Sequence, residues 1–127
     1  MVAHIAILED DEGRSVAMRN RLAESFPHCD PVLFDNAPDM IEWLRNNLTS
    51  TVLISLDHDL GPNRIRNVEV FDPGIGQDVV NYLSTQKPIC PVIIHTSNYL
   101  AAPGMELMLN DSGGCTLALY LSTTWSG

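Results

Sequence analysis

The sequence predicts an α/β domain in which five parallel strands form a doubly wound sheet with helices on both faces. Two observations carry this prediction: short apolar runs alternate with segments of helical period, and acidic residues follow the first and third of these runs. Right-handed connections place the strands in the order 2-1-3-4-5. Of the 127 residues 45% are hydrophobic, which suits one core, so we expect residues 1–127 to form a single domain.

Five runs have the length and the β-branched content of buried strands. In chain order they are His4–Leu8, Pro31–Phe34, Thr51–Leu56, Pro91–Thr96 and Cys115–Leu121. We expect their carboxyl ends to meet at one edge of the sheet, where open parallel sheets bind their ligands.

The first two connecting segments have clear helical signals. The first helix is predicted from about Glu12 to Phe26, where apolar residues recur every fourth position, while Arg14 and the two other arginines of the segment face water. The second is predicted to open at Asn36 as its N-cap and to stop near Thr49.

The second half of the chain is less regular. A third helix is predicted from about Ile75 to Thr85, and a fourth only from about Met105 to Asn110, because Pro103 and the following glycine delay its start. The polar stretch Gly61–Gly74 is interpreted as an exposed loop beside the site. After the fifth strand only Ser122–Gly127 remain, so we expect the usual last helix to be missing. Either a partner covers the exposed flank of the sheet or the natural C-terminus is altered.

Two acidic clusters are predicted at the carboxyl edge of the sheet. Glu9, Asp10 and Asp11 follow the first strand, and Asp57 and Asp59 follow the third. Carboxylates a few ångströms apart repel one another unless a cation lies among them, so all five are candidate ligands of Mg²⁺, with Mn²⁺ as the alternative. The competing interpretations are that the first cluster caps the following helix and that the second closes a turn.

Two histidines accompany these carboxylates. His58 lies between Asp57 and Asp59, and His95 stands near the end of the fourth strand, just before Thr96. A lone histidine is more often packed than catalytic, but two at neighbouring strand ends favour proton transfer near neutral pH. The hydroxyl and amide groups from Thr96 onward could donate to phosphate oxygens or cap a helix.

Charge and cysteine content exclude several other classes of function. The net charge of −9 disfavours duplex nucleic acid, because such binding rests on basic groups. The apolar run Val2 to Leu8 is too short to span a membrane, so we expect a soluble, cytoplasmic protein. Three widely spaced cysteines form no C-x-x-C pair and are interpreted as free thiols.

The run Ile5-Ala6-Ile7-Leu8-Glu9-Asp10-Asp11 resembles the first strand and acidic pocket of response regulator receiver domains. The resemblance covers about residues 4 to 121 and implies a flavodoxin-like fold. It implies that Asp57 is the phosphoacceptor, that Asp10 is a direct metal ligand paired with Glu9, that the carbonyl of Asp59 joins the metal shell, and that Thr96 supplies a hydroxyl to the phosphoryl group.

Other features resemble a divergent branch of these domains. Receivers carry a lysine after the fifth strand, whereas the only lysine here is Lys87. The runs Leu56–Gly61 and His95–Asn98, each with an added histidine, are similar to cyclic-phosphate-processing receiver domains. This resemblance implies phosphodiester chemistry on a small cyclic phosphate.

Three functions remain open from the sequence. In the first, Asp57 accepts a phosphoryl group from a histidine kinase or a small phosphodonor and signals to a protein partner. In the second, a metal-dependent enzyme opens or removes a cyclic or terminal phosphate, with His58 or His95 as acid or base. Its metal ligands would be Asp10 and Asp57, with Asp11 or Asp59 as a further candidate. In the third, the domain only binds another protein. A homodimer is a further alternative.

Overall fold

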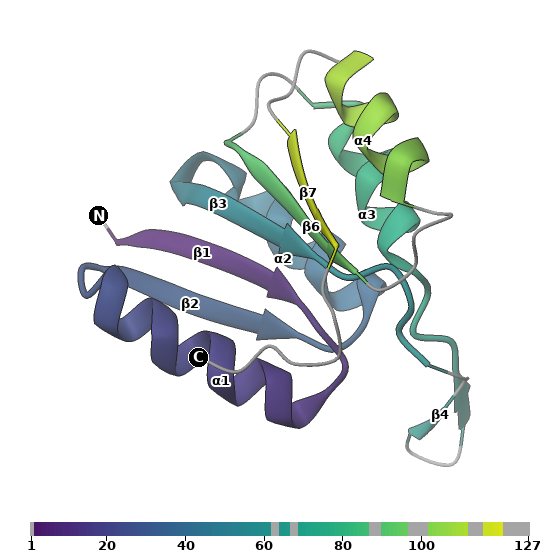
Figure 1. Ribbon diagram of the computed structural model, residues 1–127. Helices are drawn as coiled ribbons and strands as arrows, with labels where there is room; N and C mark the ends of the chain where they lie inside the picture. The colour runs from purple at the N-terminus through teal and green to yellow at the C-terminus, as the bar shows by residue number, and fades with distance from the viewer. Residues whose placement is uncertain are drawn as a thin grey trace.

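The computed structural model describes residues 2–61, 64–66, 69–86, 90–96, 102–111 and 116–120. Its main feature is a five-stranded sheet in the order β2-β1-β3-β6-β7 (Figure 1). The strands are β1 Ala3–Leu8, β2 Cys29–Phe34, β3 Thr51–Leu56, β6 Val92–Thr96 and β7 Thr116–Tyr120. All neighbours in the sheet are parallel. The predicted doubly wound α/β sheet and its strand order are therefore confirmed.

Four α-helices connect the strands of the described chain: α1 Glu12–Ser25, α2 Ala37–Asn47, α3 Gly76–Leu83 and α4 Ala102–Asp111. A short 3₁₀ turn, Leu48–Ser50, follows α2. Asn36 caps α2 as predicted, because its side chain accepts a hydrogen bond from the backbone N–H of Asp39. The prediction for α4 began too late. Pro103 lies in its first turn, where a missing N–H costs no helical hydrogen bond.

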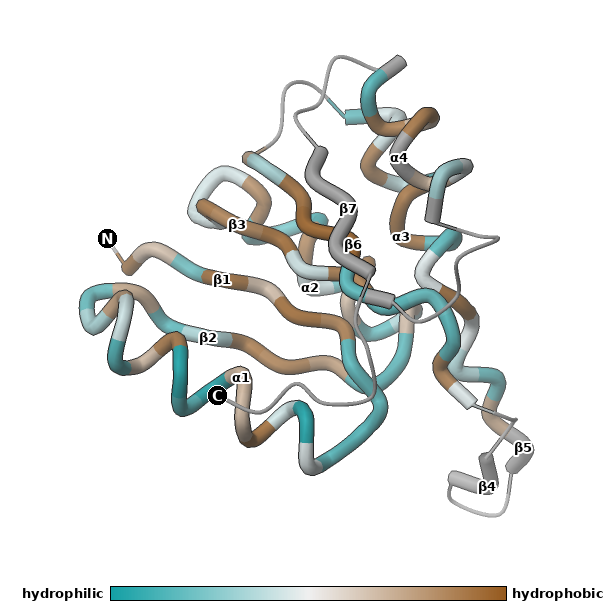
Figure 2. The backbone as a smooth tube through the Cα atoms, viewed as in Figure 1, coloured by the Kyte–Doolittle hydropathy of each residue, from teal (hydrophilic) through white to brown (hydrophobic). Residues whose placement is uncertain are grey.

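The two faces of the sheet bury separate sets of side chains. Ile5 and Ile7 of β1 pack with Met18 of α1 on one face. Ala6 and Leu8 belong to a larger cluster on the other face, to which α2, α3 and α4 all contribute. In Figure 2 much of β1, β3 and β6 is coloured as hydrophobic, whereas hydrophilic and hydrophobic residues alternate along α1. Successive strand residues therefore point to opposite layers, and odd-numbered positions of β1 face α1.

The stretch predicted as a loop between β3 and α3 contains a small antiparallel hairpin instead. It consists of β4 Arg64–Arg66 and β5 Glu69–Phe71 and projects away from the main sheet (Figure 1). In its register Ile65 is the partner of Val70. At its base, Asp59 bridges to Ile75, so both ends of the insertion are tied beside the carboxyl end of β3.

Two expectations concern other features of the chain. The predicted absence of a last helix concerns residues beyond Tyr120, which lie outside the described residues. None of the helices that the structure describes is long and apolar enough to cross a membrane.

Candidate functional site

Strand alternation brings four polar side chains to the α1 side of the sheet at its carboxyl edge. Glu9 continues the alternation of Ile5 and Ile7, and Ser55 and Asp57 continue that of Leu53, which packs on the α1 side. The fourth side chain is His95 of β6, which contacts both Ser55 and Glu9. The sheet ladder also extends into the site. The N–H of Glu9 donates to Phe34 O at 2.9 Å, and that of Asp57 donates to Leu8 O at 3.0 Å.

Three carboxylates meet at this edge. Glu9, Asp10 and Asp57 each offer an oxygen within 4.8 Å of the other two. Glu9 and Asp57 are buried, with exposed fractions of 2% and 6%. Burial raises the pKa of Asp10, and the negative charge of Glu9 raises it further. This repulsion is what a bound divalent cation would relieve, and an all-oxygen donor set suits Mg²⁺ or Mn²⁺.

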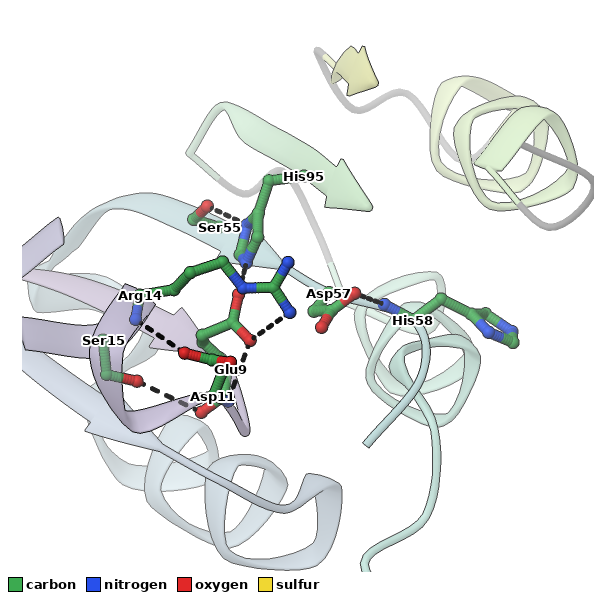
Figure 3. A network of polar contacts seen from close by, with 8 residues as sticks. All are labelled: Glu9, Asp11, Arg14, Ser15, Ser55, Asp57, His58 and His95. Atoms are coloured by element: carbon green, nitrogen blue, oxygen red, sulfur yellow. Dashed lines mark hydrogen bonds and ion pairs between the residues drawn. The ribbon is translucent and has the colours of Figure 1, made fainter. Parts of the chain in front are cut away.

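Glu9 is held by contacts on both of its carboxylate oxygens (Figure 3). Its Oε2 accepts the N–H of Asp11 at 3.0 Å and lies 3.3 Å from Nη2 of Arg14. Its Oε1 lies 3.3 Å from Nε2 of His95. Burial alone would raise the pKa of Glu9, but the contacts with His95, the Asp11 N–H and Arg14 together lower it. Glu9 is therefore ionised at neutral pH.

His95 lies beneath this cluster rather than at its surface. Its side chain is 1% exposed, and its Nδ1 lies 2.5 Å from the hydroxyl of Ser55. Nε2 is buried against Glu9 without a hydrogen bond of good geometry to any described residue. The imidazole thus connects β3 to β1 through Ser55 and Glu9, on the protein side of the carboxylates.

His58 occupies a different place. Its backbone N–H donates to Oδ1 of Asp57 at 2.8 Å, but its imidazole points away from Glu9 and His95 (Figure 3). Its Nδ1 lies 2.7 Å from Oδ1 of Asp59. The side chain of His58 is 15% exposed and that of Asp59 is 63% exposed. The two histidines are therefore on opposite sides of Asp57, and they do not form one acid–base pair.

The remaining predicted site residues do not join the three carboxylates as side chains. Asp11 is the N-cap of α1, and its Oδ1 accepts the N–H of Arg14 at 2.8 Å. This is the capping role that competed with metal binding for this residue. Asp59 points toward His58. Thr96 ends β6 at the same edge, but its side chain lies outside the part of the chain that the structure describes, as do Ser97 and Asn98.

Two residues of the site were missed by sequence reasoning. Arg14 was predicted to face water, but its side chain is only 29% exposed and pairs with Glu9. That prediction was wrong because the first turn of α1 lies over the end of β1, so a residue three positions after the cap reaches back to the carboxylates. Ser55 carried a signal that could have been used, since it lies two positions before Asp57 and must share its face.

Comparison with known proteins agrees with this fold. A protein-family model described as "Cyclic-phosphate processing Receiver domain" matches residues 5–111. No curated protein matches the chain.

Solved structures of response regulators are similar in fold. The phosphorylated cyanobacterial phytochrome response regulator RcpA is 17% identical, with a TM-score of 0.66 over 93% of this chain and 81% of that one. The Mn²⁺-bound response regulator Rcp1 is 14% identical, with a TM-score of 0.67 over 97% and 84%. A receiver domain from Rhodospirillum rubrum has the same identity and TM-score over 97% and 83%. These similarities establish the fold of the chain.

Proposed function

The chain belongs to the family of cyclic-phosphate processing receiver domains, and from that premise we propose that it accepts a phosphoryl group on Asp57 with the help of a divalent cation. The observation that carries the proposal is the meeting of Glu9, Asp10 and Asp57, whose ligand oxygens lie within 4.8 Å of one another. Asp57 belongs to this cluster and also stands at the carboxyl end of a central strand, where ligands of parallel sheets bind.

The residues present fit a hard cation. Carboxylate oxygens are the ligands that Mg²⁺ and Mn²⁺ prefer, and Rcp1, which shares the fold, has been solved with Mn²⁺ bound. Asp10 and Asp57 would hold the ion directly, with the carbonyl of Asp59 as a further ligand and Glu9 beside them. When bound, the ion would offset the charge of the carboxylates and of the phosphoryl oxygens.

The chain itself positions the reacting carboxylate. The backbone N–H of Asp57 is fixed by Leu8 O, and Oδ1 accepts the N–H of His58. In the reaction, a carboxylate oxygen of Asp57 forms a bond to phosphorus while the bond from phosphorus to the donor's leaving atom breaks, and its electron pair stays with the donor. The leaving atom is an imidazole nitrogen in a phosphorylated histidine kinase and an oxygen in acetyl phosphate. Thr96, at the end of β6, would contact the phosphoryl oxygens through its hydroxyl.

The partners follow from this chemistry. The donor would be a histidine kinase or a small phosphodonor in the cytoplasm, and the phosphorylated surface would be recognised by another protein. The net charge of −9 argues against a nucleic-acid duplex as that partner.

Mass spectrometry tests the phosphoacceptor role directly. Acetyl phosphate with Mg²⁺ is expected to add about 80 Da to the protein, the mass of one phosphoryl group. Asp57→Asn should abolish the adduct, whereas Asp30→Asn, which changes an exposed aspartate of β2, should leave it intact. An adduct of equal yield on Asp57→Asn would show that another residue is phosphorylated.

The description of the family favours a second candidate, the opening of a small cyclic phosphate. Water would add to phosphorus, one ester P–O bond would break, and the leaving oxygen would take a proton. His58 is the better donor of that proton, since it is partly exposed whereas His95 is buried.

Turnover of a 2′,3′-cyclic nucleotide with Mg²⁺ separates the two functions. Under this alternative His58→Ala lowers kcat by roughly 10²–10⁴-fold, and no stable adduct forms with acetyl phosphate. An adduct without turnover excludes the alternative. Failure of both assays on a protein that still binds Mg²⁺ would favour a module that acts only by binding another protein.

A further inference from the structure

Arg14 brings a positive charge to the carboxylate cluster. Its Nη2 lies 3.3 Å from Oε2 of Glu9, and its charge also lowers the pKa of Asp10, against the larger effects that raise it. Among the ion pairs of the described residues, this is the one that joins an arginine or lysine to the cluster. The other arginines of α1, at positions 19 and 21, are exposed.

The guanidinium of Arg14 has N–H donors that its ion pair with Glu9 does not use. A guanidinium carries five N–H donors, and the ion pair with Glu9 uses Nη2. Nε is buried and has no hydrogen-bond partner among the described residues. In Figure 3 the side chain extends from α1 over Glu9, with its guanidinium end directed to the side on which Asp57 lies. A buried donor without a partner is costly, so an oxygen acceptor at this position would stabilise it.

Charge balance indicates which acceptor fits. Glu9 and Asp10 carry two negative charges when ionised, and a phosphorylated Asp57 carries roughly two more in place of the single charge of its carboxylate. A divalent cation offsets only two of these four charges. An arginine that stays beside the cluster reduces the remaining negative charge. The planar arrangement of its N–H donors also matches the oxygens of a phosphoryl group.

We propose that Arg14 is a phosphoryl-binding residue of this site, which keeps its contact with Glu9 through Nη2 and donates its remaining N–H groups to the oxygens of the bound phosphoryl group. This role rests on the proposed function of the carboxylate cluster. It also makes Arg14 a competitor of the metal. In the absence of an ion, the positive charge of Arg14 already offsets the negative charge of Glu9.

Two affinities with opposite expected changes test the role. Isothermal titration calorimetry would measure binding of Mg²⁺ alone, and then of beryllofluoride, a phosphoryl mimic, at saturating Mg²⁺. In Arg14→Gln we expect Mg²⁺ to bind as tightly as in the wild type or up to about tenfold more tightly, because a cation beside its ligands is gone. Beryllofluoride should bind at least about tenfold more weakly, and Arg14→Lys, which keeps the charge without the fork, should recover part of this loss.

Arg19→Gln is the matched control, because it removes the same charge from an exposed position of the same helix. It should change neither affinity by more than about twofold. Equal beryllofluoride affinity in the two variants would overturn the role of Arg14. A parallel loss of both affinities in Arg14→Gln would also overturn it, because it would show a purely structural contribution. A wild-type protein that binds Mg²⁺ but no beryllofluoride, or equal binding by Asp57→Asn, would instead refute the proposed function on which the role rests.

Discussion

Glu9 is a buried carboxylate whose orientation depends on three neighbours from two elements. Arg14 comes from α1, Asp11 from the cap of that helix, and His95 from β6. A buried charge destabilises the folded state unless it is paired. Loss of one neighbour of Glu9 should therefore lower the free energy of unfolding, even though the other neighbours remain. His95 matters most to this balance, because it also satisfies the hydroxyl of Ser55.

We therefore expect His95→Leu to lower the free energy of unfolding by about 2–4 kcal/mol, since it leaves Glu9 and Ser55 without their shared partner. Urea denaturation measures the change. His95→Gln, which can still donate and accept, should lose less. Combining His95→Leu with Ser55→Ala should cost less than the sum of the two single changes, because both partners of one contact are then absent. A His95→Leu protein as stable as the wild type would show that these contacts add nothing.

The raised pKa of Asp10 predicts a pH-dependent stability. Burial and the charge of Glu9 disfavour the ionised form in the folded protein. A carboxyl group whose pKa is raised on folding supports the folded state below its ordinary value of 3.8, and this support is lost as the pH rises through the raised pKa.

In the presence of a chelator, Asp10→Asn should accordingly raise Tm at pH 7, and the gain should shrink toward zero below pH 3.8. Thermal unfolding at both pH values measures this difference. Glu24→Gln, on the exposed end of α1, serves as the control and should give no comparable gain. An equal gain for Asp10→Asn at both pH values would argue against a charge effect.

Among the helices, α3 is packed at its first residue, Gly76, against Asp57 and His58, which directly follow β3. The backbone N–H of Gly76 donates a hydrogen bond to the backbone oxygen of His58 at 2.8 Å. A Cβ on Gly76 would lie 2.0 Å from the backbone oxygen of Asp57 and 3.0 Å from the Cα of His58. Glycine is needed here for the close approach of two backbones, and this approach fixes the end of β3.

Gly76→Ala should consequently destabilise the protein by about 3 kcal/mol or more, because the helix must move away from β3. It should also weaken Mg²⁺ binding by displacing Asp57. Gly104→Ala is the matched control, since a Cβ there meets nothing within 4 Å and alanine favours the helix. Chemical denaturation measures the free energy of unfolding of both variants. Similar values for the two would refute the close packing of α3 on the end of β3.

For the molecule as one unit, the position of the carboxylate cluster predicts that metal binding is coupled to folding. Its members come from the ends of β1 and β3 and are brought together only by the folded sheet. A ligand that binds only the folded state raises the free energy of unfolding by about 2.7 kcal/mol at a concentration 100 times its Kd. For a domain of this size we expect Tm to rise by about 10 °C under these conditions.

Differential scanning calorimetry over a series of Mg²⁺ concentrations tests this coupling. Asp57→Asn should flatten the dependence of Tm on Mg²⁺, whereas Asp30→Asn should not. A wild-type Tm that does not change with Mg²⁺ or Mn²⁺ would show that the cluster binds neither ion.

Much of this architecture could be read from local patterns. Strand order, the Asn36 cap and the closeness of Glu9, Asp10 and Asp57 all follow from alternation, capping chemistry and the shared edge of parallel strands. The hairpin between β3 and α3 was missed because its strands are only three residues long, too short for a clear period.

The residue order predicts that carboxylates from the ends of the first and third strands meet, since parallel strands end together, but it does not say that Asp11 and Asp59 stay out of the cluster. The surroundings of these carboxylates follow from the packing of the folded chain. This packing buries His95 behind Glu9, turns His58 away toward Asp59, and brings Arg14 from α1 onto the cluster. The contacts of His95 and Arg14 with Glu9 join residues that lie on different elements, and the contact of Arg14 depends on the orientation in which α1 packs on the sheet. Periodicity along one element carries no information about that orientation.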